Sequence, residues 1–161
     1  PLANLIDATN VISLNVTGVS DAAGNAGVGI SNSNNYTINT VRPTAGIVVT
    51  DTSLIAGETS LVTITFSEAV TGFGNADLTI ASGTLSAVAT TDGGITWTAT
   101  FTPTASISDA TNVITLQNDG VLNTAGNAGV GTTDSNNYAV DTVRPTATIL
   151  VADTSDRNSD A

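Results

Sequence analysis

The sequence predicts an all-β protein whose strands pack as two-layered sandwiches, and three observations carry that prediction. Apolar and polar residues alternate in short runs, which is the pattern of strands with one buried face. Polar turn residues such as Gly, Asn, Asp and Ser separate these runs. No stretch has the apolar spacing of an amphipathic helix. The core is therefore expected to lie between β-sheets.

The clearest predicted strand covers residues 95–101, where four apolar residues, from Ile95 onward, share one face and three threonines share the other. Residues 61–66 follow the same pattern. Trp97 is expected to anchor the core, since a lone Trp on an apolar strand face is usually buried. Seven short strands in about 100 residues predict a Greek-key β-sandwich of immunoglobulin type. The other strands are expected at 45–50, 78–81, 84–89, 112–116 and 136–141.

The sequence repeats with a period of 102 residues. When residues 1–59 are superposed on residues 103–161, 33 of the 59 positions are identical. A unit of about 100 residues is a full domain with its own core. We therefore expect three parts: the C-terminal part of one repeat (1–40), a complete repeat (41–142) and the N-terminal part of a third (143–161).

The two copies of the run Thr-Val-Arg-Pro-Thr mark the joints between repeats. One copy follows Asn39 and the other follows Asp141. Proline fixes φ, removes a backbone donor and favours extended geometry in the residue before it. Each run is therefore expected to form a stiff joint between neighbouring repeats.

The composition excludes several classes of function. The chain has 3 Lys and Arg against 14 Asp and Glu, and its formal net charge is −11. Nucleic acids and anionic membranes both need basic patches, so neither is an expected partner. No apolar run is long enough for membrane insertion. The absence of His removes the commonest general base, and the absence of Cys removes disulfides.

The expected strand order gathers acidic residues at two poles of the sandwich. One pole receives the turn at 51–58, the turn at Asp109 and the end of the last strand at Asp141. The other receives the turn at 68–77 and the loop at 119–134. Head-to-tail packing then brings acids of two domains to one joint, where Ca²⁺ would hold them together. The plainer alternative is that each Asp only shapes its own turn. The candidate calcium ligands are Asp141, Asp51, Glu58, Asp109, Glu68, Asp77 and Asp134.

Several motifs in combination resemble the bacterial Ig-like tandem repeats of giant RTX-type adhesins. They are the Asp-Thr-Val-Arg-Pro-Thr-Ala run at 141–147 and the segments 56–70, 74–79 and 94–101. The resemblance implies extender modules: β-sandwiches in series, exported by a type I secretion system and stiffened by Ca²⁺ at domain junctions. Such modules project a distal binding region from the cell surface for attachment or biofilm formation. Carried onto this sequence, the junction acid is Asp141, assisted by Asp51 and Glu58.

The leading hypothesis is therefore a non-catalytic, extracellular structural module whose partners are the neighbouring Ig-like repeats of its own chain. A pairing of Glu68 with Asp77 for glycoside hydrolysis is disfavoured, because a tandemly copied unit rarely carries a cleft. Two alternatives stay open. One is an extracellular fibre subunit that assembles with other copies of the chain by strand exchange. The other is a carbohydrate- or surface-binding module.

Overall fold

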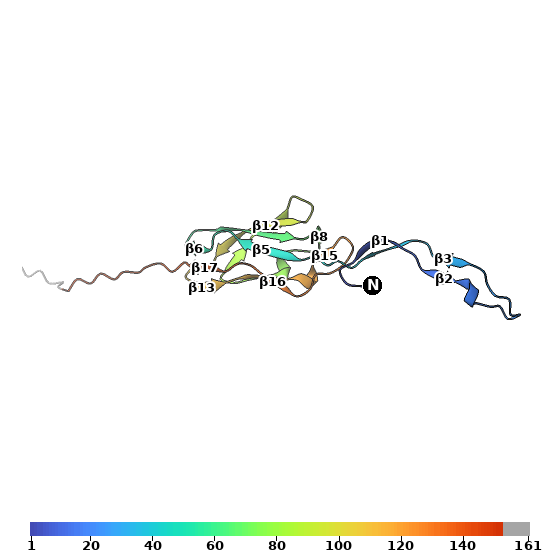
Figure 1. Ribbon diagram of the computed structural model, residues 1–161. Helices are drawn as coiled ribbons and strands as arrows, with labels where there is room; N and C mark the ends of the chain where they lie inside the picture. The colour runs from blue at the N-terminus through green and yellow to red at the C-terminus, as the bar shows by residue number, and fades with distance from the viewer. Residues whose placement is uncertain (153–161) are drawn as a thin grey trace, which may run out of the picture.

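The computed structural model describes residues 1–152 as an elongated chain of β-strands (Figure 1). No α-helix occurs in this range, only the short 3-10 turns η1 (Val16–Gly18), η2 (Asn75–Asp77) and η3 (Asn118–Gly120). Within the same residues, no helix has the length and apolarity needed to cross a membrane. The predicted all-β, immunoglobulin-like sandwich is confirmed. Residues 153–161 of the expected third repeat lie outside the described residues.

The first layer of the sandwich is a sheet built around the two most clearly alternating runs. β12 pairs with β7 in antiparallel register, so that Trp97 lies opposite Ile64 and Phe101 opposite Ser60. β7 pairs in turn with β5, and β10 and β11 both pair with β12. These strands are β5 (Ala45–Val49), β7 (Ser60–Phe66), β10 (Gly83–Leu85), β11 (Ala89–Thr90) and β12 (Thr96–Pro103).

The second layer consists of three small sheets with the orders β13-β17-β6, β16-β14-β9 and β15-β8. All of its pairings are antiparallel except that of β6 with β17, which is parallel and places Leu54 opposite Val140. The strands are β6 (Ser53–Ile55), β8 (Val70–Thr71), β9 (Leu78–Ile80), β13 (Ser108–Asn112), β14 (Ile114–Gln117), β15 (Leu122–Asn123), β16 (Thr132–Asp134) and β17 (Tyr138–Asp141).

The core lies between the two layers and takes one face of each alternating strand. Phe101 of β12 and Tyr138 of β17 are both 0% exposed, and their rings meet edge to face with centroids 4.9 Å apart. This arrangement is favourable for aromatic pairs. Trp97 is only partly buried and packs edge-on against Phe73, with centroids 5.2 Å apart. The central anchor is therefore the Phe101–Tyr138 pair and not Trp97.

Three sequence-based strand assignments need correction. The run 84–89 is two strands, β10 and β11, rather than one. The run 112–116 spans two strands, because Asn112 ends β13, which pairs with β17, and Ile114 begins β14, which pairs with β16 and β9. β13 also carries a register shift between Asp109 and Asn112. Ile95 precedes β12 and is 40% exposed, although alternation placed it inward. Alternation thus located the strands but not their bulges.

Residues 1–40 carry counterparts of four second-layer strands, β13, β14, β16 and β17, and nothing of the first layer. They form β1 (Ile6–Asn10), β2 (Ser13–Asn15), β3 (Ile30–Asn32) and β4 (Tyr36–Asn39), each 102 positions before a counterpart in β13 to β17. Without the first layer their apolar side chains are open to solvent. Tyr36 is 40% exposed, whereas its counterpart Tyr138 is fully buried. The local sequence therefore specifies the hairpins, and long-range packing specifies burial.

The turn before β12 depends on a charged carboxylate, which gives stability a pH dependence. Asp92 accepts hydrogen bonds from the backbone N–H groups of Ile95 and Thr96 and from the Thr90 hydroxyl. These bonds, the Thr96 backbone bond first, lower the pKa of Asp92 to about 2. A carboxyl whose pKa is lower in the folded state than in the unfolded state stabilises the fold at any pH above the unfolded-state pKa. This stabilisation is lost as the pH falls toward the folded-state pKa.

We therefore expect the Asp92→Asn variant to unfold at lower urea concentration than the parent chain at pH 7. The difference should shrink between about pH 5 and pH 2, where the parent carboxylate becomes protonated. Urea titrations of both chains at several pH values, followed by Trp97 fluorescence, measure this difference in stability. A difference that stayed constant over this range would show that the Asp92 charge contributes nothing.

Candidate functional site

The joint between the upstream segment and the complete domain is held by side-chain hydrogen bonds. We call residues 39–44 the upstream joint. The Asn39 side chain accepts a hydrogen bond from the Val41 N–H at 3.0 Å, which turns the chain at the start of the joint. Pro43 is buried. The joint therefore combines a local turn at Asn39 with a proline packed into the structure.

The loop 123–128 of the complete domain holds the upstream joint through side-chain hydrogen bonds. Asn123 Nδ2 donates to the Val41 carbonyl oxygen at 2.9 Å, and Asn127 Nδ2 donates to the Asn39 carbonyl oxygen at 3.1 Å. In the reverse direction, Arg42 Nη1 donates to the Ala128 carbonyl oxygen at 2.8 Å. These contacts link residues more than 80 positions apart in the sequence. The joint is thus clamped to the domain that follows it.

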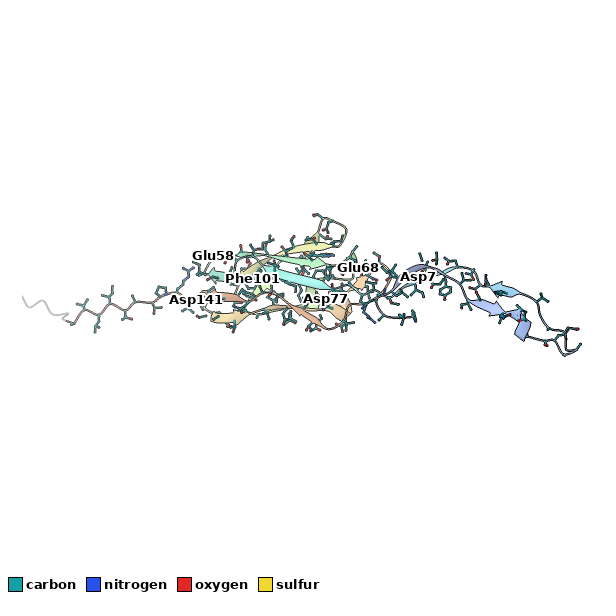
Figure 2. All side chains as sticks on the ribbon, in the orientation of Figure 1. Asp7, Glu58, Glu68, Asp77, Phe101 and Asp141 are labelled. Atoms are coloured by element: carbon teal, nitrogen blue, oxygen red, sulfur yellow. The ribbon has the colours of Figure 1, made fainter. Side chains whose placement is uncertain are left out.

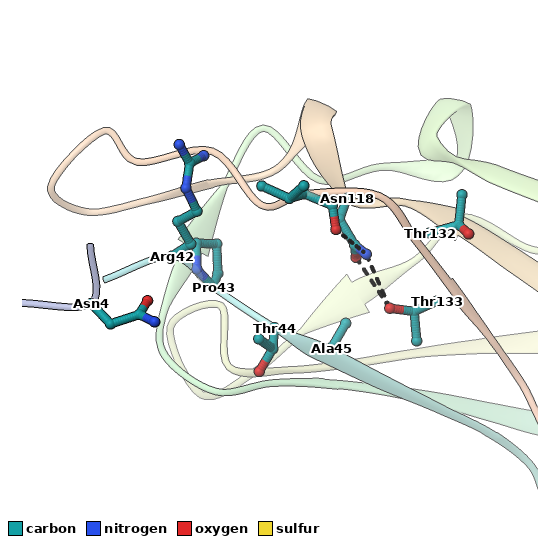
Figure 3. A pocket seen from close by; sticks show the side chains of 9 residues that line it. Asn4, Arg42, Pro43, Thr44, Ala45, Asn118, Thr132 and Thr133 are labelled. Atoms are coloured by element: carbon teal, nitrogen blue, oxygen red, sulfur yellow. Dashed lines mark hydrogen bonds between the residues drawn. The ribbon is translucent and has the colours of Figure 1, made fainter. Parts of the chain in front are cut away.

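A pocket of about 350 Å³ opens beside this clamp and is lined by residues of both parts of the chain (Figure 3). Asn4 contributes from the upstream segment, and Arg42 is its one charged lining residue. Asn118, which is 7% exposed, donates from Nδ2 to the Thr133 hydroxyl at 3.1 Å. The lining contains no carboxylate, so it offers no acid–base pair. We interpret this pocket as the space left where the upstream segment packs against the complete domain.

Of the acids predicted for the upstream pole, Glu68 lies at the joint, whereas Asp77 and Asp134 bond elsewhere. Both carboxylate oxygens of Glu68 accept hydrogen bonds from Asn123 Nδ2 at 3.1 Å, so Glu68 supports the clamp. Asp77 accepts from the Gly74 N–H at the start of η2. The expected loop position of Asp134 is wrong: it ends strand β16, where the Thr115 hydroxyl donates to it at 2.6 Å.

The downstream pole brings acidic residues closer together. Figure 2 labels Glu58 and Asp141 at the end of the sandwich opposite Glu68. Asp109 and Asp141 line one pocket of about 210 Å³. Glu58 is linked to them through Ile55, because Glu58 Oε2 accepts from the Ile55 N–H at 3.0 Å and Ile55 pairs with Asp141. Asp51 caps its own turn by accepting from the Ser53 N–H at 3.0 Å.

The donor chemistry of the downstream pole fits a hard cation, while its geometry supplies only part of a site. All available ligands are carboxylate or carbonyl oxygens, the type that Ca²⁺ prefers. Asp141 uses one oxygen to accept from the Val143 N–H at 3.2 Å. Among residues 1–152, no three acidic side chains form a group that could hold a metal ion. A complete shell would need carbonyls, water or residues of a following domain.

The upstream joint fits a cation less well than the downstream pole. The position between the Val41 carbonyl and the Glu68 carboxylate is taken by Asn123 Nδ2, which is a hydrogen-bond donor. Asn123 is 2% exposed, so the donor is held inside the structure. The two poles of the domain therefore differ in chemistry.

Comparison with known protein families agrees with the architecture. The family model described as bacterial Ig-like domain matches residues 1–38 and 39–140. The chain belongs to the bacterial Ig-like domain family. Neither the curated proteins nor the solved structures give a match to this sequence. Bacterial Ig-like domains are typically extracellular or surface-exposed structural modules, and they are typically non-catalytic.

Sequence reasoning missed the residues that form the clamp of this bacterial Ig-like domain. Asn123 and Asn127 both lie at the pole where the 119–134 loop was expected, although Asn123 ends strand β15. The sequence analysis considered only the carboxylates of that pole. A signal was present in the sequence: Asn123 stands where the upstream repeat has Asp21, two positions before the shared motif Ala-Gly-Asn-Ala-Gly. The sequence does not show which backbone carbonyls accept hydrogen bonds from these amide nitrogens.

Proposed function

We propose that this chain is part of the spacer region of a large bacterial surface adhesin, in which Ig-like repeats in series project a distal binding region for attachment or biofilm formation. Export by a type I secretion system, as in RTX-type adhesins, is part of the proposal. The single observation that supports it best is the clamp between the upstream joint and loop 123–128. A joint held from both sides transmits orientation from one repeat to the next.

The arrangement of the chain ends supports a role in extension. The upstream segment meets the domain at one pole, and residues 141–146 leave at the opposite pole (Figure 1). Repeats connected in this way add their lengths rather than folding back. A proline in each joint restricts the backbone further.

We further propose that Ca²⁺ stiffens the joint at the downstream pole. Asp109, Asp141 and Glu58 would contribute carboxylate oxygens, with Asp51 as an accessory, and the following domain would complete the shell. Bound Ca²⁺ would offset the repulsion between carboxylates and favour one arrangement of neighbouring repeats. The proposal concerns a chain in which a full domain follows residue 142.

Removing calcium is the direct test of that part of the proposal. We expect millimolar Ca²⁺ to raise the unfolding temperature of a two-repeat chain by several degrees, because a ligand at 100 times its Kd adds about 2.7 kcal/mol. The Asp141→Asn variant should lose most of this increase. Asp134→Asn, which changes an exposed acid on β16, is the matched control and should keep it. An equal increase for all three chains, or the same increase with Mg²⁺, would indicate charge screening instead of a site.

A second candidate function, assembly with other copies of the chain, is favoured by exposed apolar side chains. Ile12 and Leu14 are 66% and 55% exposed, and Ile149 and Leu150 are 92% and 87% exposed. Leu14 lies in β2, which among the described residues pairs only with β3, and the open edges of such a two-stranded sheet can pair with another chain. Light scattering over a range of concentrations tests this candidate, and a strictly monomeric full chain would remove it. The aromatic residues of the sandwich are mostly buried, so no platform favours carbohydrate binding.

A further inference from the structure

The side chain of Asn123 lies in a cradle of oxygen atoms at the upstream joint. Its Nδ2 is 2.9 Å from the Val41 carbonyl oxygen and 3.1 Å from each carboxylate oxygen of Glu68. Its Oδ1 accepts from the N–H groups of Ala125 and Asn127 at 3.1 and 2.8 Å. One amide therefore fills two roles: its oxygen shapes the loop, and its nitrogen connects the loop to the joint and to Glu68.

The counterpart in the upstream repeat, Asp21, keeps only the first of these roles. Asp21 Oδ1 accepts from the N–H groups of Ala23 and Asn25 at 2.9 Å, as Asn123 does in its own loop. Its second oxygen accepts from Asn25 Nδ2 at 2.9 Å. This side-chain bond, with the backbone bonds, lowers the pKa of Asp21, so the residue is charged at neutral pH. A carboxylate has no donor to offer a carbonyl oxygen.

The difference matters because every neighbour of Asn123 Nδ2 is an acceptor. A carboxylate at position 123 would place a further oxygen beside Val41 O and the half-buried Glu68 carboxylate. Buried acceptors without a donor are costly, and adjacent carboxylates repel each other. Only a proton or a cation could hold such a group of oxygens together, and an all-oxygen set favours a hard divalent ion such as Ca²⁺.

We propose that Asn123 makes the upstream joint independent of cations, its amide nitrogen taking the place that a divalent cation would have to fill if an Asp stood there. The identity of this one residue thus determines whether a joint is held by a hydrogen bond or requires an ion. The inference rests on the part of the proposed function that connects repeats in series. It does not depend on calcium at the downstream pole.

A distance measurement across the joint in the full chain tests this proposal. The sequence has no Cys, so spin labels can be attached at Ala8→Cys and Thr98→Cys, which lie on opposite sides of the joint and are exposed. The parent chain should give the same narrow distance distribution in EGTA and in CaCl₂. Asn123→Asp should lose the narrow distribution in EGTA and regain it in CaCl₂. Adding Glu68→Gln to Asn123→Asp should abolish the recovery.

The matched control is Asn137→Asp, which makes the same change of charge at an exposed loop asparagine away from the joint, bonded to Ala110. It should behave as the parent chain in both conditions. A parent distribution that broadens in EGTA would overturn the proposal, and so would an Asn123→Asp chain that stays narrow there. The parent measurement decides even if Asn123→Asp does not fold. A parent chain that is broad in both conditions would instead overturn the spacer function itself.

Discussion

Replacing Tyr138 by alanine is expected to lower the free energy of unfolding of the 41–142 domain by about 3–5 kcal/mol, the usual cost of removing a large buried ring. Tyr138 is 0% exposed, packs edge-on against Phe101 and donates its hydroxyl hydrogen to the Ala81 carbonyl. The substitution removes the contact that joins the two layers at their centre. Urea titration followed by Trp97 fluorescence reports it, because the single Trp lies in this domain.

Two control variants separate the ring from its hydroxyl and from its local sequence. Tyr138→Phe keeps the ring and loses one hydrogen bond, so it should cost about 1 kcal/mol. Tyr36→Ala makes the same change in the upstream repeat, where the ring is 40% exposed, and should leave the Trp97 transition unchanged. If Tyr138→Ala cost no more than Tyr138→Phe, the Phe101–Tyr138 pair would not be the centre of the core.

The contrast between Tyr36 and Tyr138 also indicates what a sequence of this kind can predict. Both lie in the motif Ser-Asn-Asn-Tyr, and both begin a strand in which the Tyr pairs with an Asn 26 positions earlier. Strand positions follow from alternation and turn residues, which are local, so the sandwich could be predicted. Burial follows from strands such as β7 and β12, which are distant in sequence. The same motif therefore has two different environments.

Features that depend on non-local pairing were less predictable. The parallel pairing of β6 with β17 joins Leu54 to Val140, and the stretch around it was expected to be only a turn. Trp97 was expected to anchor the core, but it is only partly buried and packs beside Phe73. The strand pattern gave the inward face of Trp97, whereas β6 was not expected as a strand. The position along the core was decided by neighbours far along the chain.

The candidate site follows the same division. The strand order is enough to predict that Glu58, Asp109 and Asp141 gather at one pole, since it depends only on alternating strand directions. The joint itself was predicted from its proline run, but the hydrogen bonds that clamp it could not be, because Asn123 and Val41 are 82 positions apart. A carboxylate can be proposed as a cation ligand from its charge alone. The role of an amide side chain can be assigned only when its hydrogen-bond partners are known.

Replacing Gly94 by alanine is expected to destabilise the domain by about 2–4 kcal/mol and to loosen the upstream joint. The φ angle of Gly94 is +99°, which L-residues rarely adopt, and a Cβ built there would lie 2.6 Å from the Val70 carbonyl oxygen. Val70 cannot move freely, because it pairs with Asn123 in the β8–β15 ladder and its N–H donates to the Gly94 carbonyl at 3.0 Å. Displacing Val70 should therefore displace Asn123 from the Glu68 carboxylate.

Gly93→Ala is the matched control, because Gly93 also has a positive φ of +79° but has no atom within 4 Å of a built Cβ. It should carry only the backbone penalty of about 1–2 kcal/mol and leave the joint intact. Urea titration gives the stability of both variants, and the spin-label distance between positions 8 and 98 gives the order of the joint. The two variants differ in whether the new methyl group meets Val70. If only Gly94→Ala loosens the joint, the displacement of Val70 is what moves Asn123. Equal behaviour of the two variants in both measurements would mean that the approach of Gly94 to Val70 supports neither the fold nor the joint.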